Sequence, residues 1–203
     1  MTLIIRLVFL LLFTTSCSFM DKENLLIVKN SITGYPQNII TEQMFLSQKF
    51  SFAEVSLGRG PSAILSLRSI ENNIFEWQSA DGIIIYTYNG FVVKTFGLDN
   101  DIETNFKSLE FETPLIQNVS FLRPPLYGID FELSVLERSQ KLIKKGWVNL
   151  DTQQILISKS VPFLRWKSIE KFWINKETNL VEKTIQHIHP QLPPIKITFY
   201  YKY

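Results

Sequence analysis

From Phe50 onward, apolar and polar side chains alternate along the chain with a period of two. The runs FAEVSLG and AILSLRSI both show it, and in the second Leu65 and Leu67 share one face while Ser66 and Arg68 share the other. Successive side chains of a β-strand point to opposite faces, so this period predicts strands with one buried face. The first half of the chain is therefore expected to be mainly β.

The clearest segment is the middle of the chain. The runs IFEWQS, IIIYTY and FVVKT are separated by Asp81-Gly82 and Asn89-Gly90. These dipeptides favour the positive φ angles of tight hairpin turns, so the runs predict an antiparallel meander. The preceding strand is expected to join it through Glu71–Asn73.

The second half repeats the pattern. Strands are predicted at FELSVLER, KGWVNLD, QQILISKSV, KSIEKFWIN, LVEKTIQHI and IKITFYYKY, with a turn near Asp151-Thr152 and a break at PQLPP. Short helices are predicted at NLLIVKNSI and at TEQMFLSQ, the second capped by Thr41 with Met44 and Phe45 buried. A helical turn is predicted to begin at Asp99 or Asp101. The expected fold is an antiparallel meander curled into a barrel, half-barrel or sandwich, with short N-terminal helices.

The first sixteen residues have a different character. Arg6 is their one charge, and the apolar stretch that follows ends at Phe13. A spanning helix needs about 20 apolar residues, so this layout predicts a signal peptide that is removed. The predicted organisation is a signal peptide at 1–16, a lipidated N-terminus with a short helix at 17–35, and one β-rich periplasmic domain at 36–203.

The lone cysteine, Cys17, directly follows the small residues Thr14, Thr15 and Ser16. This resembles a bacterial lipobox, in which the thiol is diacylglycerylated and the signal is cut just before it. The alternative is an ordinary secretory signal that leaves an unpaired thiol, which is a liability in an oxidising compartment. By the same resemblance, Ser18 at the next position implies the outer membrane, on its periplasmic face.

Charge and composition bear on two questions, whether nucleic acid is a partner and whether a disulfide can form. The chain has 203 residues and a net charge of +2, which falls to +1 when Arg6 is removed with the signal. This balance gives no electrostatic reason to expect nucleic acid as a partner. With one cysteine, no internal disulfide can form.

Candidate catalytic and metal-binding groups are few. His187 and His189 would share one face of a strand, but no further zinc ligands are apparent. The stretch LGRGP has no phosphate-loop spacing and predicts a turn at a strand end. Four carboxylates, Glu76, Asp81, Glu170 and Glu182, have no recognisable catalytic context. We therefore predict a protein that is not an enzyme and has no metal or cofactor.

The four tryptophans are Trp77, Trp147, Trp166 and Trp173. Tryptophans in a β-rich domain mostly fill the core, although their flat faces also stack on sugar rings. Trp166 is flanked by Arg165 and Lys167, so Trp166 and Arg165 are the candidate ligand or partner surface.

A set of motifs resembles the group 4 capsule polysaccharide lipoprotein family, GfcB/YjbF. The set comprises Trp77, the Ser79–Gly82 turn, Ile83–Ile85, Asn89-Gly90, and Thr95, Gly97 and Leu98, with Phe91 in place of the family's usual arginine. The segments LGRGPSAILSL and FWINKETNLVEKTIQHIHPQLPPIKITFYYKY resemble the family's Leu-Gly-x-Gly-Pro segment and its C-terminal stretch.

The resemblance implies a mostly β, barrel-like outer-membrane lipoprotein that supports capsule or exopolysaccharide assembly or secretion without catalysis. Its implied partners are the outer membrane, through the lipid on Cys17, and an outer-membrane polysaccharide export protein. The alternative is a carbohydrate- or lipid-binding module that uses an aromatic-lined β surface, with polysaccharide as its partner.

Overall fold

The computed structural model describes residues 30, 33–35, 39–105, 111, 115–121 and 128–202. Residues 59–61 and the described residues among 1–36 form one small compact unit, and residues 37–58 with 62–202 form the other. In the small unit, the Gly34 amide donates to the Asn30 carbonyl and the Tyr35 amide donates to the Arg59 carbonyl. Most of the predicted helix NLLIVKNSI, and Cys17, lie outside the described residues. Among the residues described, no helix has the length and hydropathy needed to cross a membrane.

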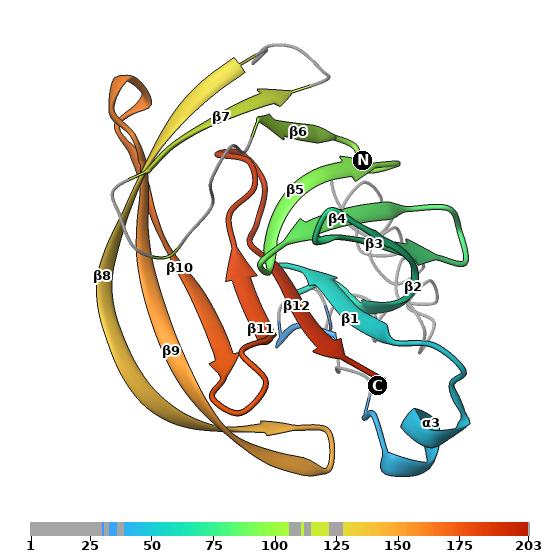
Figure 1. The fold of residues 1–203 in the computed structure, drawn as a ribbon. Helices are drawn as coiled ribbons and strands as arrows, with labels where there is room; N and C mark the ends of the chain where they lie inside the picture. The colour runs from blue at the N-terminus through green and yellow to red at the C-terminus, as the bar shows by residue number, and fades with distance from the viewer. Residues whose placement is uncertain are drawn as a thin grey trace, which may run out of the picture. The chain divides into compact units, whose positions relative to one another are not determined.

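The larger unit is an antiparallel barrel in which every strand pairs with its neighbours in sequence (Figure 1). Its strands are β1 (Phe52–Leu57), β2 (Ser62–Glu71), β3 (Ile74–Ser79), β4 (Ile84–Tyr88), β5 (Phe91–Phe96), β6 (Ile102–Asn105), β7 (Leu115–Phe121), β8 (Gly128–Lys145), β9 (Val148–Val161), β10 (Trp166–Asn175), β11 (Val181–Gln186) and β12 (Ile195–Tyr200). Pairing of β1 with β12 closes the ring. The predicted mainly β fold is confirmed, as a closed barrel.

The predicted hairpin turns in the first half are present. Asn72 and Asn73 have φ of 51° and 64°, and Asn89 and Gly90 have φ of 47° and 77°. Asparagine and glycine tolerate these angles better than other residues, which explains why they occupy the turns. The turn at Asp81-Gly82 also forms, with the Ile83 amide donating to the Ser79 hydroxyl over 2.9 Å.

The barrel interior is filled by inward-facing apolar side chains. The rings of Phe91 and Phe172 lie 4.4 Å apart, and those of Trp77 and Phe199 lie 5.3 Å apart. The indole N–H of Trp77 donates to the Thr87 hydroxyl over 2.9 Å, so this buried polar group is satisfied. A continuous aromatic core thus joins strands from both halves of the chain.

The β8–β9 hairpin is much longer than its neighbours and extends past the end of β10, which pairs with β9 only over Thr152–Val161 (Figure 1). At its tip Trp147 stacks on Tyr200 of β12, which stacks in turn on Phe52 of β1. Phe45 of the helix α3 (Glu42–Ser47) lies 5.1 Å from Trp147. The hairpin tip and α3 therefore build a small second core on the outer face of the barrel.

Helix α3 follows its sequence pattern only in part. Thr41 caps it as predicted, accepting a hydrogen bond from the Met44 amide over 3.2 Å. The expectation that Met44 is buried is wrong, because its side chain is 44% exposed. Phe45 is the one residue of this six-residue helix that is half-buried, and none is fully buried.

Two predicted local features, a strand-breaking turn and a helical turn, are absent. No turn forms at Asp151-Thr152: β9 runs through it, Thr152 is fully buried, and the hairpin reverses instead at Gly146, whose φ is 57°. The predicted helical turn at Asp99 or Asp101 is also wrong, because Asp99 lies in the β5–β6 turn and strand β6 begins at Ile102. The Asp101 carboxylate accepts hydrogen bonds from the amides of Gly97 and Leu98, so it stabilises the β5–β6 turn.

Candidate functional site

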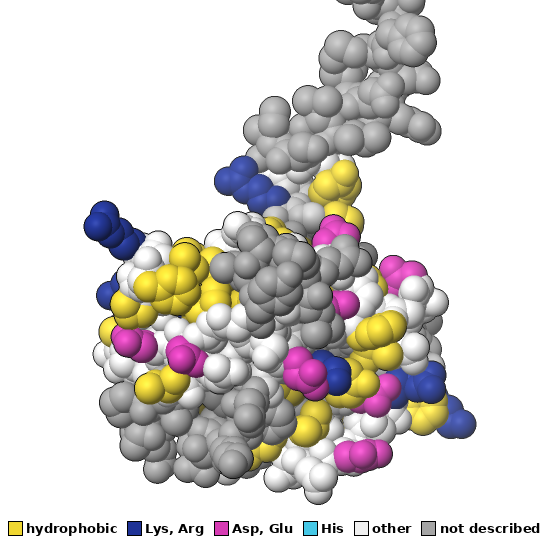
Figure 2. Space-filling model, turned by 90° about the horizontal axis from the view of Figure 1, so that it is seen from above, with side chains coloured by type: hydrophobic (Ala, Val, Ile, Leu, Met, Phe, Trp, Pro, Cys, Tyr) yellow, Lys and Arg dark blue, Asp and Glu magenta, His cyan; other side chains and the backbone are white. Residues whose placement is uncertain are grey.

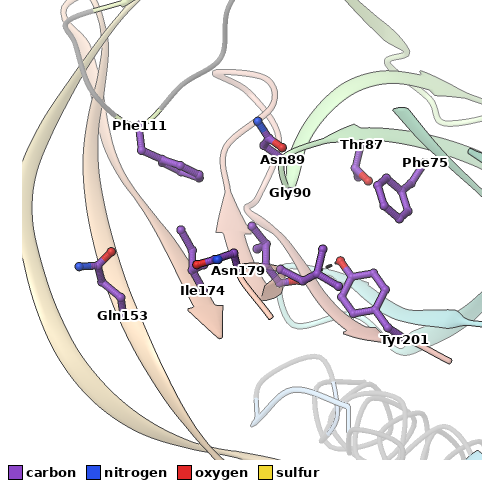
Figure 3. Close-up of a pocket in the computed structure, with 11 residues that line it drawn as sticks. Phe75, Thr87, Asn89, Gly90, Phe111, Gln153, Ile174, Asn179 and Tyr201 are labelled. Atoms are coloured by element: carbon purple, nitrogen blue, oxygen red, sulfur yellow. Dashed lines mark hydrogen bonds between the residues drawn. The ribbon is translucent and has the colours of Figure 1, made fainter. Parts of the chain in front are cut away.

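A cavity of about 310 Å³ opens where the β4–β5 and β10–β11 turns approach β9 (Figure 3). Its volume is at the lower end of the range for small-molecule sites, about 300–1,000 Å³. The side chains that line it come from segments separated by more than a hundred residues in sequence, and Tyr201, just after β12, closes one side. Only the closed barrel brings these segments together.

Three aromatic side chains form part of the cavity wall: Phe75, Phe111 and Tyr201. The Phe75 and Tyr201 rings meet edge to face with centroids 6.1 Å apart, and Phe75 stacks on the core residue Trp77. Phe111 packs against Phe91 at 5.2 Å. Each ring is thus held in place by the core and is half-buried at the cavity.

Three side-chain amides line the same cavity: Asn89, Gln153 and Asn179. Asn89 and Asn179 have φ of 47° and 57°, so turn geometry accounts for asparagine at both positions. Gln153 has no such reason, since it lies in a strand opposite Ile174. Within the described part of the chain, no hydrogen bond of these three amide groups to protein is found.

The described cavity lining carries no carboxylate, amine, guanidinium or imidazole. The Tyr201 hydroxyl donates to the Val181 carbonyl over 2.9 Å, and the Thr87 hydroxyl accepts from Trp77. The Arg138 guanidinium donates to the Phe111 carbonyl beside the cavity. The cavity lining therefore combines aromatic rings with neutral hydrogen-bonding groups.

A second polar cluster lies inside the barrel, around the ion pair of Lys159 and Glu170. Nζ of Lys159 lies 3.4 Å from the Glu170 carboxylate, and the two side chains are 5% and 1% exposed. The His187 amide donates to Glu170 over 3.1 Å, and Lys159 donates to the His187 carbonyl over 3.0 Å. Burial raises the pKa of Glu170, while the charge of Lys159 opposes that rise. Every charge in the cluster has a partner, as buried charges require.

The two histidines do not lie on one strand face, so that prediction is wrong. Strand β11 ends at Gln186, and both residues follow it in the segment that leads to β12. The His189 Nδ1 accepts a hydrogen bond from the Gln191 amide over 3.0 Å. No group of three potential metal ligands occurs among the described residues.

The four candidate carboxylates are each held by a different partner. Glu76 accepts from the Ser69 hydroxyl over 3.0 Å, and Asp81 from that of Ser79. Glu170 pairs with Lys159, as above.

Glu182 pairs with Lys145 near the tip of the long hairpin, and its side chain is 4% exposed. Trp173 pairs with Lys183 and Ile174 with Val181, which leaves Glu182 as an extra residue in β11. This bulge aims the carboxylate at Lys145 and at the Asn175 amide, which donates over 3.0 Å.

Trp166 and Arg165, the candidate ligand surface, point in different directions. The half-buried Trp166 ring packs edge to face on Phe131 at 5.7 Å and on His187 at 6.1 Å. Arg165 is exposed and has a φ of 51° in the turn after the 3₁₀ helix η2 (Pro162–Leu164). Neither lines the aromatic and amide cavity. Of the other tryptophans, Trp77 and Trp173 are buried and Trp147 belongs to the outer core.

The surface seen in Figure 2 mixes acidic, basic and apolar side chains, without a field of one sign in its described part. This distribution agrees with the near-neutral net charge.

The sequence gives little indication of which residues line the cavity. Gln153 is the exception, because an amide stands at an inward position of a strand whose next inward residues are Ile155 and Ile157.

Comparison with known proteins places the chain in a family. A family model described as "Group 4 capsule polysaccharide lipoprotein gfcB, YjbF" matches residues 28–200. The crystal structure of the hypothetical lipoprotein YmcC from Escherichia coli (K12) superposes with a TM-score of 0.65 at 16% sequence identity, covering 92% of this chain and 98% of that one. That likeness extends the fold to a solved lipoprotein. A search of curated proteins found no match. The chain belongs to the GfcB/YjbF family of group 4 capsule polysaccharide lipoproteins.

Proposed function

We propose that this protein is a non-catalytic outer-membrane lipoprotein that supports the assembly or secretion of a capsule or exopolysaccharide. The observation that carries the proposal is the family match over residues 28–200. The lipobox-like segment ending at Cys17 supports the anchoring part of the proposal.

The non-catalytic part rests on the chemistry of the barrel. General acid–base catalysis needs a titratable side chain within reach of the reacting group, and nucleophilic catalysis needs an activated nucleophile. The described cavity lining has no acid, base or activated nucleophile. The buried carboxylates Glu170 and Glu182 are occupied by ion pairs with Lys159 and Lys145.

In this role the barrel is a rigid body tethered at the membrane, positioned to contact an outer-membrane export protein and the polymer in transit. A closed barrel has no unpaired sheet edge, which protects such a domain from edge-to-edge association. Its working surface must therefore be side chains and loops, not an added strand.

Deletion of the gene in its own organism, followed by measurement of surface-bound and released polysaccharide, tests this proposal. We expect both pools of the dependent polymer to fall, and a plasmid copy of the parent gene to restore them. Unchanged polymer while the pathway is demonstrably active would refute it.

A further inference from the structure

We propose that the cavity between the β4–β5 turn, the β10–β11 turn and β9 binds one neutral sugar unit of a glycan chain. This inference rests on the proposed function for the source of the glycan, but its physical argument comes from the cavity itself. Figure 3 shows residues of all these elements around the cavity.

The cavity lining pairs aromatic rings with side-chain amides. A pyranose has apolar C–H faces and a rim of hydroxyl groups that donate and accept hydrogen bonds. Aromatic rings suit the faces, and side-chain amides suit the rim because each carries two donors and an acceptor. The cavity presents Phe75 and Tyr201 beside Asn89, Gln153 and Asn179.

Gln153 lines the cavity with an amide that no described protein group binds. It is half-buried at an inward position of β9, and the next two inward residues along the strand, Ile155 and Ile157, are apolar. The other polar inward residue of β9, Lys159, is satisfied by Glu170. No hydrogen bond of the Gln153 amide to protein occurs in the described part of the chain, so its donors and acceptor are available to a ligand.

The described lining of the cavity carries no charged side chain. An acidic sugar would call for a cationic side chain aimed at its carboxylate, and the described lining holds none. Arg138, whose guanidinium donates to the Phe111 carbonyl, is not among the lining residues. Asn89 and Asn179 are exposed to water and Gln153 is half-buried. An acyl chain would remove this water without giving the three amides new partners, which is unfavourable. Neutral glycan is the ligand class that uses both kinds of lining group.

The test is a ligand titration followed by saturation-transfer difference NMR. It uses the full-length lipoprotein in a polyoxyethylene detergent, because glycoside detergents would compete. The probes are methyl glucoside, methyl galactoside, N-acetylglucosamine, glucuronic acid and oligosaccharides from partial hydrolysis of the organism's own polymer. We expect saturation of at least one neutral probe, weaker or no binding of glucuronic acid, and little dependence on salt.

Two variants of cavity residues and one control variant test whether the sugar binds in this cavity. Gln153→Ala and Asn179→Gly should each weaken binding about five- to tenfold, the effect of losing about one net hydrogen bond. Glycine keeps the positive φ at position 179, so that variant removes the amide without straining the turn. Asn72→Gly is the matched control, because Asn72 has a φ of 51° in another hairpin and does not line the cavity. It should bind as the parent does.

Three results would overturn the inference: no binding of any neutral probe, equal or tighter binding of glucuronic acid, or binding that Gln153→Ala and Asn179→Gly leave unchanged. These outcomes are separate from the gene-deletion test. A protein that the polymer pathway requires but that binds no probe refutes the cavity assignment alone. A protein that binds sugar but is dispensable for polymer refutes the proposed function alone.

Discussion

Gly90 in the β4–β5 turn packs directly against Val181 at the start of β11. A β-carbon at position 90 would lie 2.6 Å from Cγ1 of Val181, closer than real contacts allow, and the φ of Gly90 is 77°. Two hairpins from opposite halves of the chain thus meet through a glycine. Because Gly90 and Val181 both line the cavity, this contact also sets its width.

Gly90→Val should lower the free energy of unfolding by about 2–5 kcal/mol, combining the backbone cost of positive φ with overpacking against Val181. Gly82→Val is the control. Gly82 has a φ of 89°, but a β-carbon there would meet nothing within 4 Å, so the substitution should cost about 1–2 kcal/mol. Chemical denaturation of both variants measures the difference. Equal losses would contradict the role of the Val181 contact.

The Lys145–Glu182 pair predicts a large effect of removing one partner. Lys145→Met leaves a carboxylate that is 4% exposed without its cation, which should cost about 3–5 kcal/mol of stability. Lys94→Met breaks the Lys94–Glu103 pair, whose side chains are 44% and 53% exposed, and should cost about 0–1 kcal/mol. The urea midpoint reports both changes. Similar midpoints would show that burial of the first pair is unimportant.

Stability should decrease with acidification below neutral pH. Burial lowers the pKa of His189 below its ordinary 6.5, so the unfolded chain binds protons before the folded one. The stabilising contribution of the neutral imidazole is therefore complete above about pH 6.5 and is lost as the pH falls through the lowered pKa. His189→Asn keeps an acceptor for the Gln191 amide and removes the titration.

The measurement compares thermal midpoints of the parent and His189→Asn at pH 7.5 and 5.5, and the parent should lose more. The contribution of Glu170 to stability has the opposite pH dependence. Because the pKa of Glu170 is raised in the folded protein, its stabilising contribution is present at low pH and is lost as the pH rises. Both proteins contain Glu170, so its effect cancels in the comparison. A parent and variant with identical pH dependence would refute the assignment to His189.

Substitutions at Trp166 and Arg165, the two residues of the candidate ligand surface, should have different effects on stability. Trp166→Ala removes the contacts with Phe131 and His187 and should destabilise the fold by about 2–4 kcal/mol, somewhat less than loss of a fully buried tryptophan. Arg165→Gly should leave stability unchanged or raise it by about 0.5–1 kcal/mol, because Arg165 has a φ of 51°. Differential scanning calorimetry distinguishes them. A Trp166→Ala protein of parental stability with lost glycan binding would instead restore position 166 as a ligand contact.

The proposal that Cys17 carries the lipid, and that Ser18 permits sorting to the outer membrane, is tested by two variants. Cys17→Ser should abolish incorporation of a palmitate analogue and release the protein from membrane fractions. Ser18→Asp should keep the label but move the protein to the inner membrane, as the resemblance to sorted lipoproteins implies. Density-gradient fractionation with in-gel detection of the label measures both. Labelled Cys17→Ser would exclude this residue as the attachment site.

The period-two pattern and the Asn-Gly and Asp-Gly dipeptides determined the mainly β fold and the hairpins of the first half, because these signals depend on neighbouring residues alone. The motif set from Trp77 to Leu98 likewise indicated the family before any fold was known. The predictions at Asp151-Thr152, Asp101 and His187 are wrong for different reasons. Thr152 is buried in a continuous strand. Strand β11 ends one residue before His187. At Asp101 the reason is local, because the carboxylate binds amides only three and four residues away.

Only the tertiary structure decided where the cavity lies and which residues share it. Asn89, Gln153 and Asn179 are far apart in sequence, and two of the three look like ordinary turn residues. Closing the barrel through β1 and β12 fixes the position of Tyr201 beside Phe75 and the fit of Gly90 against Val181. Such long-range proximity follows from the closure and register of the sheet, and no local sequence pattern determines these. The alternation of apolar and polar residues that forms each strand depends on neighbouring residues alone, so the sequence shows it directly.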